Sequence, residues 1–247
     1  MRDYLLDLVE HTYDLGWIDL VKITGNDTET TINGLAEDRR VVVQAKFKDI
    51  IPEFAGTFGM PNLSNLKIIL GIPEYQENAK ITITNQDRNG VTCPVGLHFE
   101  NQACDFKNDY RFMTSEIISE KLKTVAFKGA NWNITFEPTM VSIQRLKFQS
   151  QANTEELFFT AKTENGDLKL FFGDHSTHAG NFVFQPGVEG TLARTWAWPV
   201  SPFINILDLT GDKVVQLSDD GAAQIIVDSG VAVYNYILPA QSKWPLT

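Results

Sequence analysis

The hydrophobic pattern of the first half of the chain shows two periods. Between Asp3 and Leu15, apolar residues return every three or four positions, which predicts an amphipathic helix that Gly16 ends. A second helical segment opens at Pro61 and ends at Gly71. Alternation of apolar and polar residues, the period of a strand, marks four further segments: 17–23, 40–47, 80–84 and 95–100.

The second half of the chain repeats this order. Ser201 is a plausible helix N-cap with Pro202 at the first helical position, and Gly211 closes that helix. Strand patterns follow at 213–217 and 223–227. The repetition predicts two similar α+β domains, each with two helices packed on β-sheets.

A lysine-rich segment, 114–131, separates the two halves and predicts a connector between domains at 1–113 and 132–247. Within the second domain, segments 156–163 and 167–172 predict a strand pair, because a turn sequence with Asn and Gly joins them. The connector and this strand pair complete the predicted plan.

Charge changes the range of functions that the pattern allows. The 247 residues include 31 Asp and Glu against 21 Lys and Arg, a formal net charge of −10. A protein that holds nucleic acid by affinity usually shows the reverse, because its cations displace phosphate counterions. A protein that encircles DNA needs only a mildly positive inner surface, so the charge argues against affinity binding and leaves encirclement open.

Motifs that carry chemistry are missing from the sequence. It has no nucleophile elbow, phosphate-cradling glycine loop, H-E-x-x-H or dinucleotide fingerprint, so we expect neither an enzyme nor a cofactor. Cys93 and Cys104 have no zinc-ligand spacing, and a reducing cytoplasm is the simplest setting. The opening residues are not typical of a signal peptide, and no run of about 18 apolar residues predicts a membrane span.

Two clusters of possible metal ligands, one with histidines and one acidic, could suggest metal sites. Asp174, His175 and His178 have no third histidine or cysteine nearby in sequence, so a polar turn is favoured over a metal site. The run from Asp219 to Gly221 opens like a calcium loop but lacks the later ligands, and a hairpin turn is favoured. We therefore predict no metal centre.

Three segments carry a resemblance to a known family. They are 59–67 (GMPNLSNLK) followed by 72–75 (IPEY), 109–113 (DYRFM) and 233–239 (VYNYILP). Their order, with the repeated domain plan and the total length, resembles the DNA sliding clamps, and the T4-like phage clamps in particular. The resemblance covers nearly the whole chain and implies the DNA-clamp fold.

The resemblance also implies an assembly and partners. Clamp rings close with six similar domains, so two domains per chain imply a homotrimer that encircles duplex DNA. Such a ring tethers a DNA polymerase and is opened by a clamp loader ATPase, without membrane contact. A phage clamp would work in the cytoplasm of the infected host cell.

Candidate DNA contacts follow from the resemblance. Lys67, Arg145 and Lys147 correspond to segments that line the hole of related rings, where cations contact phosphates without reading sequence. The plain alternative is an ordinary solvated charge. The segment around Arg145 fits both a helix and a strand. The first helix departs from the family, because its acidic residues predict a stripe opposite the apolar side: Asp3, Asp7, Glu10 and Asp14.

A candidate partner site lies near the C-terminus. Tyr236, Ile237, Leu238 and Pro239 match the segment that, in related clamps, walls an apolar pocket beneath the connector, where polymerase and loader tails dock. The plain alternative is an edge strand with buried side chains.

Two other functions compete with the clamp. A β-rich phage virion structural protein would also suit an acidic, strand-rich chain, but it predicts no internal domain repeat. A carbohydrate-binding or hydrolytic β-domain could use exposed Trp196 and Trp198. Burial is the alternative for this pair, because W-A-W puts both rings on one face of a strand.

Overall fold

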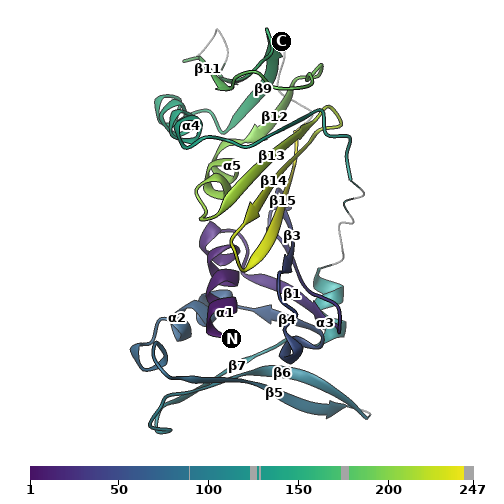
Figure 1. Ribbon diagram of the computed structural model, residues 1–247, viewed down its shortest axis with the longest axis vertical. Coiled ribbons are helices and arrows are strands. Elements are labelled where there is room, and N and C mark those ends of the chain that lie inside the picture. The colour runs from purple at the N-terminus through teal and green to yellow at the C-terminus, as the bar shows by residue number, and fades with distance from the viewer. Residues whose placement is uncertain (89, 123–126, 128, 174–177, 242–247) are drawn as a thin grey trace. The chain divides into compact units, whose positions relative to one another are not determined.

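A computed structural model describes residues 1–88, 90–122, 127, 129–173 and 178–241 (Figure 1). The chain divides into two compact units. The first unit comprises 1–126 and 229–234, and the second comprises 127–228 and 235–247. The C-terminal strand therefore contributes its first residues to one unit and the rest to the other. None of the helices in the described part of the chain is long and apolar enough to cross a membrane.

The helices of the first unit are α1 (Arg2–Glu10), α2 (Leu63–Leu70) and α3 (Ser115–Lys121). The predicted helix at the start of the chain is confirmed but shorter. Regular α-helix stops at Glu10, and a single 3-10 turn, η1 (Tyr13–Leu15), precedes Gly16. Gly16 has φ of 89°, a left-handed conformation that glycine adopts without strain.

Two antiparallel sheets complete the first unit. Four strands run in the spatial order β4-β1-β2-β3, and three run in the order β5-β6-β7. Strands β2, β4 and β7 were not predicted from the sequence pattern, and β5 and β6 extend further into their hairpin than expected. The bounds are β1 Leu20–Gly25, β2 Thr30–Leu35, β3 Val42–Phe47, β4 Gly56–Pro61, β5 Lys80–Arg88, β6 Val91–Glu100 and β7 Lys107–Arg111.

Apolar side chains hold the helices of the first unit in place. Leu5, Leu8 and Val9 of α1 are buried, as the periodicity predicted. The Tyr4 ring meets Phe47 of β3 edge to face, with ring centroids 5.5 Å apart. Buried leucines of α2 share the core, and α1 contacts α2 directly. Burial of this apolar surface is the main source of stability for such short helices.

The second unit contains α4 (Met140–Ala152) and α5 (Val200–Leu207), which contact each other. The ambiguous segment around Arg145 is a helix. Thr139 caps it, because its hydroxyl oxygen accepts a hydrogen bond from the Ser142 backbone N–H at 3.1 Å. The predicted helix near Ser201 is confirmed, although it begins two residues earlier, with Pro199 at the N-cap.

The strands of the second unit form two groups. The spatial order is β14-β13-β8 in one and β11-β10-β9-β12 in the other, and the pairs are antiparallel. The C-terminal strand β15 (Ala232–Pro239) is shared between the units. The remaining bounds are β8 Ile134–Phe136, β9 Phe158–Glu164, β10 Asp167–Phe172, β11 Gly180–Gln185, β12 Trp196–Pro199, β13 Asp212–Ser218 and β14 Ala222–Asp228.

The two tryptophans of β12 serve the core of the second unit. Trp198 is fully buried, and half-buried Trp196 donates its indole N–H to the Asp219 carbonyl oxygen at 2.8 Å. Asp219 lies in the hairpin turn between β13 and β14, as predicted, and its carboxylate accepts the backbone N–H groups of Ala193 and Arg194. Neither tryptophan offers the exposed platform that a carbohydrate-binding site would use.

Candidate functional site

Each unit presents a pair of contacting helices, α1 with α2 in the first and α4 with α5 in the second. All three predicted DNA contacts lie on these helices. Lys67 is on α2, whereas Arg145 and Lys147 are on α4. The side-chain contacts of the three residues differ, and these contacts decide how much positive charge each helix pair exposes.

The cations of the first helix pair are engaged within their own unit. The Lys67 ammonium lies 2.8 Å from the Asp14 carboxylate and 5.8 Å from the centre of the Tyr13 ring. This hydrogen bond to Asp14 raises the pKa of Lys67. Arg2 donates to the Leu70 carbonyl oxygen at the end of α2, 3.1 Å away, where a cation also complements the helix dipole. This pair therefore offers little unbalanced positive charge.

The predicted acidic stripe on the first helix is wrong in one position. Asp7 is buried, and its carboxylate accepts a hydrogen bond from the Tyr234 hydroxyl at 2.7 Å. Buried His11 stacks on the Tyr234 ring with centroids 4.5 Å apart and an interplanar angle of 13°. Asp3 and Asp14 remain exposed and Glu10 is half-buried. Periodicity alone placed Asp7 with them, because the helical wheel shows no partner from a distant strand.

The second helix pair is less acidic. Lys147 forms an ion pair with Asp208, which follows α5. Arg145 is exposed, and its guanidinium carbon lies 5.3 Å from the centre of the Phe182 ring on β11. Five exposed residues share one side of α4, because positions three, four and seven apart lie on the same side of a helix: Val141, Gln144, Arg145, Phe148 and Gln151.

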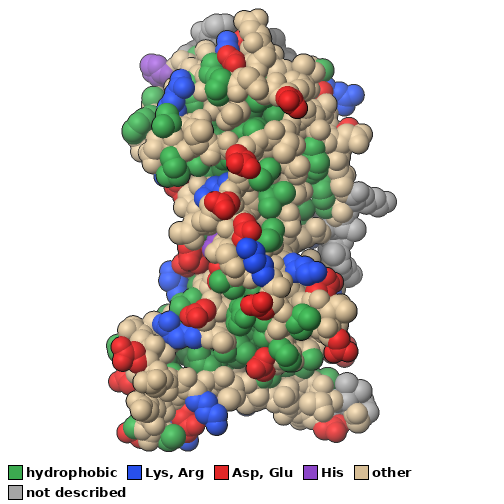
Figure 2. All heavy atoms as spheres, viewed as in Figure 1, with side chains coloured by type: hydrophobic (Ala, Val, Ile, Leu, Met, Phe, Trp, Pro, Cys, Tyr) green, Lys and Arg blue, Asp and Glu red, His purple; other side chains and the backbone are tan. Residues whose placement is uncertain are grey.

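The face of the molecule in Figure 2 shows no continuous basic surface. Blue Lys and Arg side chains are interspersed with red Asp and Glu side chains, and green apolar side chains lie between them. This pattern agrees with the net charge of −10. Strong nonspecific affinity for nucleic acid needs a basic patch, and this face does not provide one.

The four residues of the predicted partner pocket lie at the end of β15. Tyr236, Ile237 and Leu238 are buried, and Pro239 is exposed. Burial of the first three side chains fits the plain reading of a packed strand as well as the wall of a pocket. Pro239 is the one residue of the four with substantial exposed surface.

The predicted connector begins with a helix. α3 docks on β4 through Ile118, which is fully buried against Gly59. Just before α3, Met113 exchanges two backbone hydrogen bonds with Gly59, at 2.8 and 3.0 Å. Residues 123–126 and 128 of the connector lie outside the described residues. The first part of the connector is thus an ordered element of the first unit.

Metal-binding residues do not gather in the described part of the chain. No group of three or more His, Cys, Asp or Glu side chains there could hold a metal ion. Asp174 and His175 of the histidine cluster lie outside the described residues, whereas His178 lies inside them.

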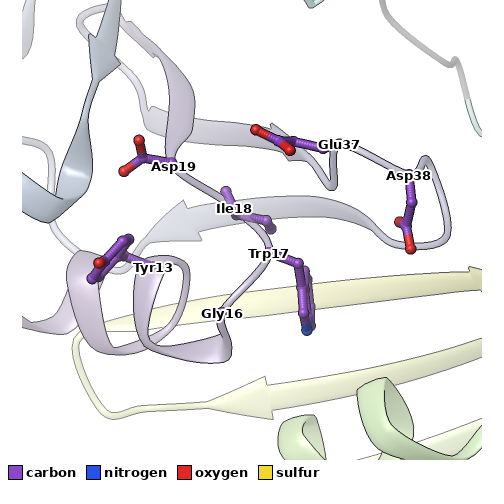
Figure 3. Close-up of a pocket in the computed structure, with 7 residues that line it drawn as sticks. All are labelled: Tyr13, Gly16, Trp17, Ile18, Asp19, Glu37 and Asp38. Carbon is purple, nitrogen blue, oxygen red and sulfur yellow. The ribbon is translucent and has the colours of Figure 1, made fainter.

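A cavity of about 300 Å³ opens beside η1 in the first unit (Figure 3). Its carboxylates serve local structure, because Asp19 accepts the Ser64 backbone N–H and Asp38 accepts that of Arg40, both at 3.0 Å. In Figure 3 the Trp17 ring points away from the carboxylates of Asp19 and Glu37. Sequence analysis did not find this cavity, since two separate segments line it, and its acidic lining does not suit a phosphate.

Comparisons with solved structures identify the architecture. A. fulgidus PCNA bound to the C-terminal region of FEN-1 matches with a TM-score of 0.69 at 9% identity, over 98% of this chain and 97% of that chain. PCNA from Thermococcus kodakaraensis matches with a TM-score of 0.67 at 10% identity, over 98% and 97%. The PCNA2–PCNA3 complex from Sulfolobus tokodaii gives 0.64 at 10% identity, over 97% and 96%. The chain has the DNA-clamp fold.

The sequence comparisons give a different result. No protein-family model matches the sequence, and comparison with curated proteins gives no match. The fold class predicted from the repeated helices and strands is nevertheless confirmed, because the clamp fold extends over nearly the whole chain.

Proposed function

We propose that this protein is a DNA sliding clamp, a processivity factor that encircles duplex DNA and tethers the replicative DNA polymerase. One observation carries the proposal: the clamp fold covers 98% of this chain and 97% of the matched clamp chains. The acidic net charge supports a ring that retains DNA by encircling it, since binding by electrostatic affinity would need a basic surface. The role requires no catalysis and no cofactor.

The proposed assembly is a homotrimer. Two units per chain give the six domains of a clamp ring when three chains join head to tail. Each unit offers the end strand of a small sheet for this contact. Strands β5 and β7 end one sheet and β11 ends the other, whereas the opposite end strand, β12, is already bridged to Gln241. End strands present unpaired backbone groups that can add a strand from a neighbour.

The proposed partners are the polymerase and an ATP-dependent clamp loader, which would dock peptide tails near Tyr236 to Pro239. The bound FEN-1 region shows that A. fulgidus PCNA accepts a partner's C-terminal segment, and a similar use of this chain is part of our proposal. We further propose the T4-like phage type, working in the cytoplasm of an infected host cell. The clamp fold disfavours the alternative of a virion structural protein.

Encirclement can be tested on DNA of two topologies. The purified protein is loaded onto nicked circular DNA with a cognate loader and ATP, and the DNA is then linearised. A sliding ring stays with the circle and runs off the linear ends. Retention on linear DNA, or a native mass that stays at one chain across concentrations, would count against the clamp.

A further inference from the structure

The sheet of strands β5, β6 and β7 has an open edge along β5. One side of β5 pairs with β6, and no strand among the described residues pairs with its other side (Figure 1). β5 has nine residues, against five in β7 at the opposite border of the sheet. An edge strand presents a row of backbone N–H and C=O groups, so β5 can pair with an added strand.

The second unit has a strand at the corresponding edge. β5 follows α2 as β13 follows α5, and each forms an antiparallel hairpin with the next strand. In the second unit β8 pairs with the other side of β13, where Ile134 lies opposite Leu217 and Phe136 lies opposite Val215. Among the described residues, this covering strand has no counterpart in the first unit.

Apolar side chains of β5 remain partly uncovered at this edge. Ile81 and Ile83 lie opposite fully buried residues of β6, so their side chains point to the core side of the sheet, yet both are only half-buried. Their counterparts in β13, Val215 and Leu217, are fully buried beside β8. The difference marks a strand surface that lacks the cover which β8 provides in the second unit.

A cavity of about 470 Å³ lies along the open edge. Residues of β5, β6 and the 3-10 turn η2 (Pro52–Phe54) line it, and its apolar lining includes Ile81, Ile83 and Pro94. Among the described residues that line the cavity, only Glu53 carries a charge, and Glu53 is exposed. The cavity therefore accepts apolar side chains, and its carboxylate attracts a cation beside them.

We propose that the open edge of β5 binds an extended segment of a protein partner as an added antiparallel strand. Two apolar side chains of this segment, two positions apart, enter the cavity beside Ile81 and Ile83, in the way that Ile134 and Phe136 of β8 cover β13. A lysine or arginine of the segment meets Glu53. In this mode of recognition, backbone hydrogen bonds give affinity and alternate side chains give specificity.

The subunit contact of the proposed ring uses other strands. β15 is the third strand after α5, and it lies beside β3, the third strand after α1. The same pairing between chains joins β7, the third strand after α2, to β11, the third strand after α4. This step rests on the proposed clamp function and leaves β5 free. The β5 edge shares no residue with the predicted pocket at 236–239, so the inference adds a second partner surface.

A short synthetic peptide tests the site by fluorescence anisotropy with the full chain. The peptide carries isoleucine and phenylalanine two positions apart, with a lysine beside them. A shuffled peptide of the same composition places the two apolar residues next to each other. We expect the first peptide to bind about tenfold more tightly, because adjacent residues point to opposite sides of a strand. Equal binding of the two peptides would overturn the inference.

Two variants locate the peptide on the protein. Glu53→Lys reverses the charge of the cavity at an exposed position, so it should weaken the lysine peptide several-fold and strengthen a glutamate version. Ile83→Lys should abolish binding, whereas Ile68→Lys, at an exposed isoleucine of α2, is the matched control and should leave binding unchanged. Unchanged binding in both Glu53→Lys and Ile83→Lys would overturn the site.

N-methylation of the peptide distinguishes strand addition from side-chain docking. One version blocks the N–H groups along one edge of the peptide strand, and a second version blocks those along the opposite edge. An added strand has a single edge against β5, so only one version should lose binding. Loss in both versions, or in neither, would overturn strand pairing.

Two further measurements separate this inference from other occupants and from the clamp function. We expect Ile83→Lys to assemble and to load on nicked circular DNA as the unmodified protein does. A lower proportion of trimer in Ile83→Lys, but not in Ile68→Lys, would make β5 a contact between copies of this chain and overturn the inference. Failure of the unmodified protein to load would overturn the proposed function, whereas specific peptide binding at β5 would still support this site.

Discussion

At the scale of single residues, buried polar contacts link parts of the first unit that are far apart in sequence. Tyr234 and Asp7 are separated by 227 positions, yet their side chains share a hydrogen bond in the core. A buried carboxylate is costly unless it is hydrogen-bonded, so this contact fixes how α1 meets the C-terminal strand.

Removal of the Tyr234 hydroxyl is expected to destabilise the protein. Tyr234→Phe leaves the buried Asp7 carboxylate without this donor, and we expect a loss of about 2 kcal/mol in the free energy of unfolding. Urea denaturation of both proteins measures this difference in the free energy of unfolding. Tyr4→Phe is the matched control, because it removes a hydrogen bond to Asp49 at the exposed surface and should cost much less. Equal losses for the two variants would contradict the role of burial.

Buried Tyr110 makes stability depend on alkaline pH. Burial, and to a lesser degree Asp19, raises the pKa of its phenol well above the ordinary value of 10.0. The unfolded chain ionises this group above about pH 10 while the folded chain does not. Its stabilising contribution is thus complete below pH 10 and declines as the pH rises further, by up to about 1.4 kcal/mol per pH unit.

Denaturation at several alkaline pH values tests this contribution. Tyr110→Phe cannot ionise and should show a shallower decline in stability above pH 10, although the variant starts lower because the Tyr110 hydroxyl donates to the Pro61 carbonyl oxygen. Tyr13→Phe serves as a control at a less buried position. An unchanged slope in Tyr110→Phe would assign the alkaline sensitivity to other groups.

At the scale of elements, α3 depends on the absence of a side chain in β4. A Cβ atom on Gly59 would lie 2.8 Å from two carbon atoms of Ile118, closer than such atoms approach. This glycine therefore creates the space in which the only buried side chain of α3 packs. Helices of seven residues are unstable alone, so docking must supply their stability.

Gly59→Ala is expected to loosen α3 while the rest of the unit stays folded. Hydrogen exchange of the backbone amides in 115–121 should become faster, because the helix loses its packing contact. Gly71→Ala is a suitable control, since the nearest atoms to its added carbon would be 3.4 Å away. Unchanged exchange in α3 would show that the strand accommodates the methyl group.

At the scale of the whole molecule, the net charge of −10 acts on assembly as well as on DNA. Like-charged chains repel, and salt screens this repulsion beyond about 10 Å at 0.1 M. We expect moderate salt to strengthen the ring, with the proportion of trimer rising between about 20 and about 200 mM salt. Sedimentation velocity measures the proportion of trimer at each salt concentration. Weaker assembly in salt would indicate that ion pairs across the subunit contact outweigh the overall repulsion.

Many of the helices and strands could be predicted from the local pattern of apolar and polar residues. The spacing of Leu5, Leu8 and Val9 fixed the buried side of α1, and the alternation in residues 213–217 fixed a strand, because side-chain periodicity follows directly from backbone geometry. The repetition of these elements along the chain predicted the fold class, and the comparison with solved clamp structures confirms it. Strands β2 and β4 escaped prediction, since glycine and polar residues weaken their alternation.

The sequence by itself determined α1, α2 and α5, more than half of the strands and the acidic balance, and the family resemblance added three candidate cations. It left α4 ambiguous and did not predict α3. Tertiary structure alone decided which of those cations keep their charge, because Asp14 and Asp208 reach Lys67 and Lys147 from positions 53 and 61 residues away. It also moved Asp7 from the predicted acidic stripe into the core. Periodicity reports which side of an element a residue occupies, whereas its charge environment depends on chain segments that only folding brings together.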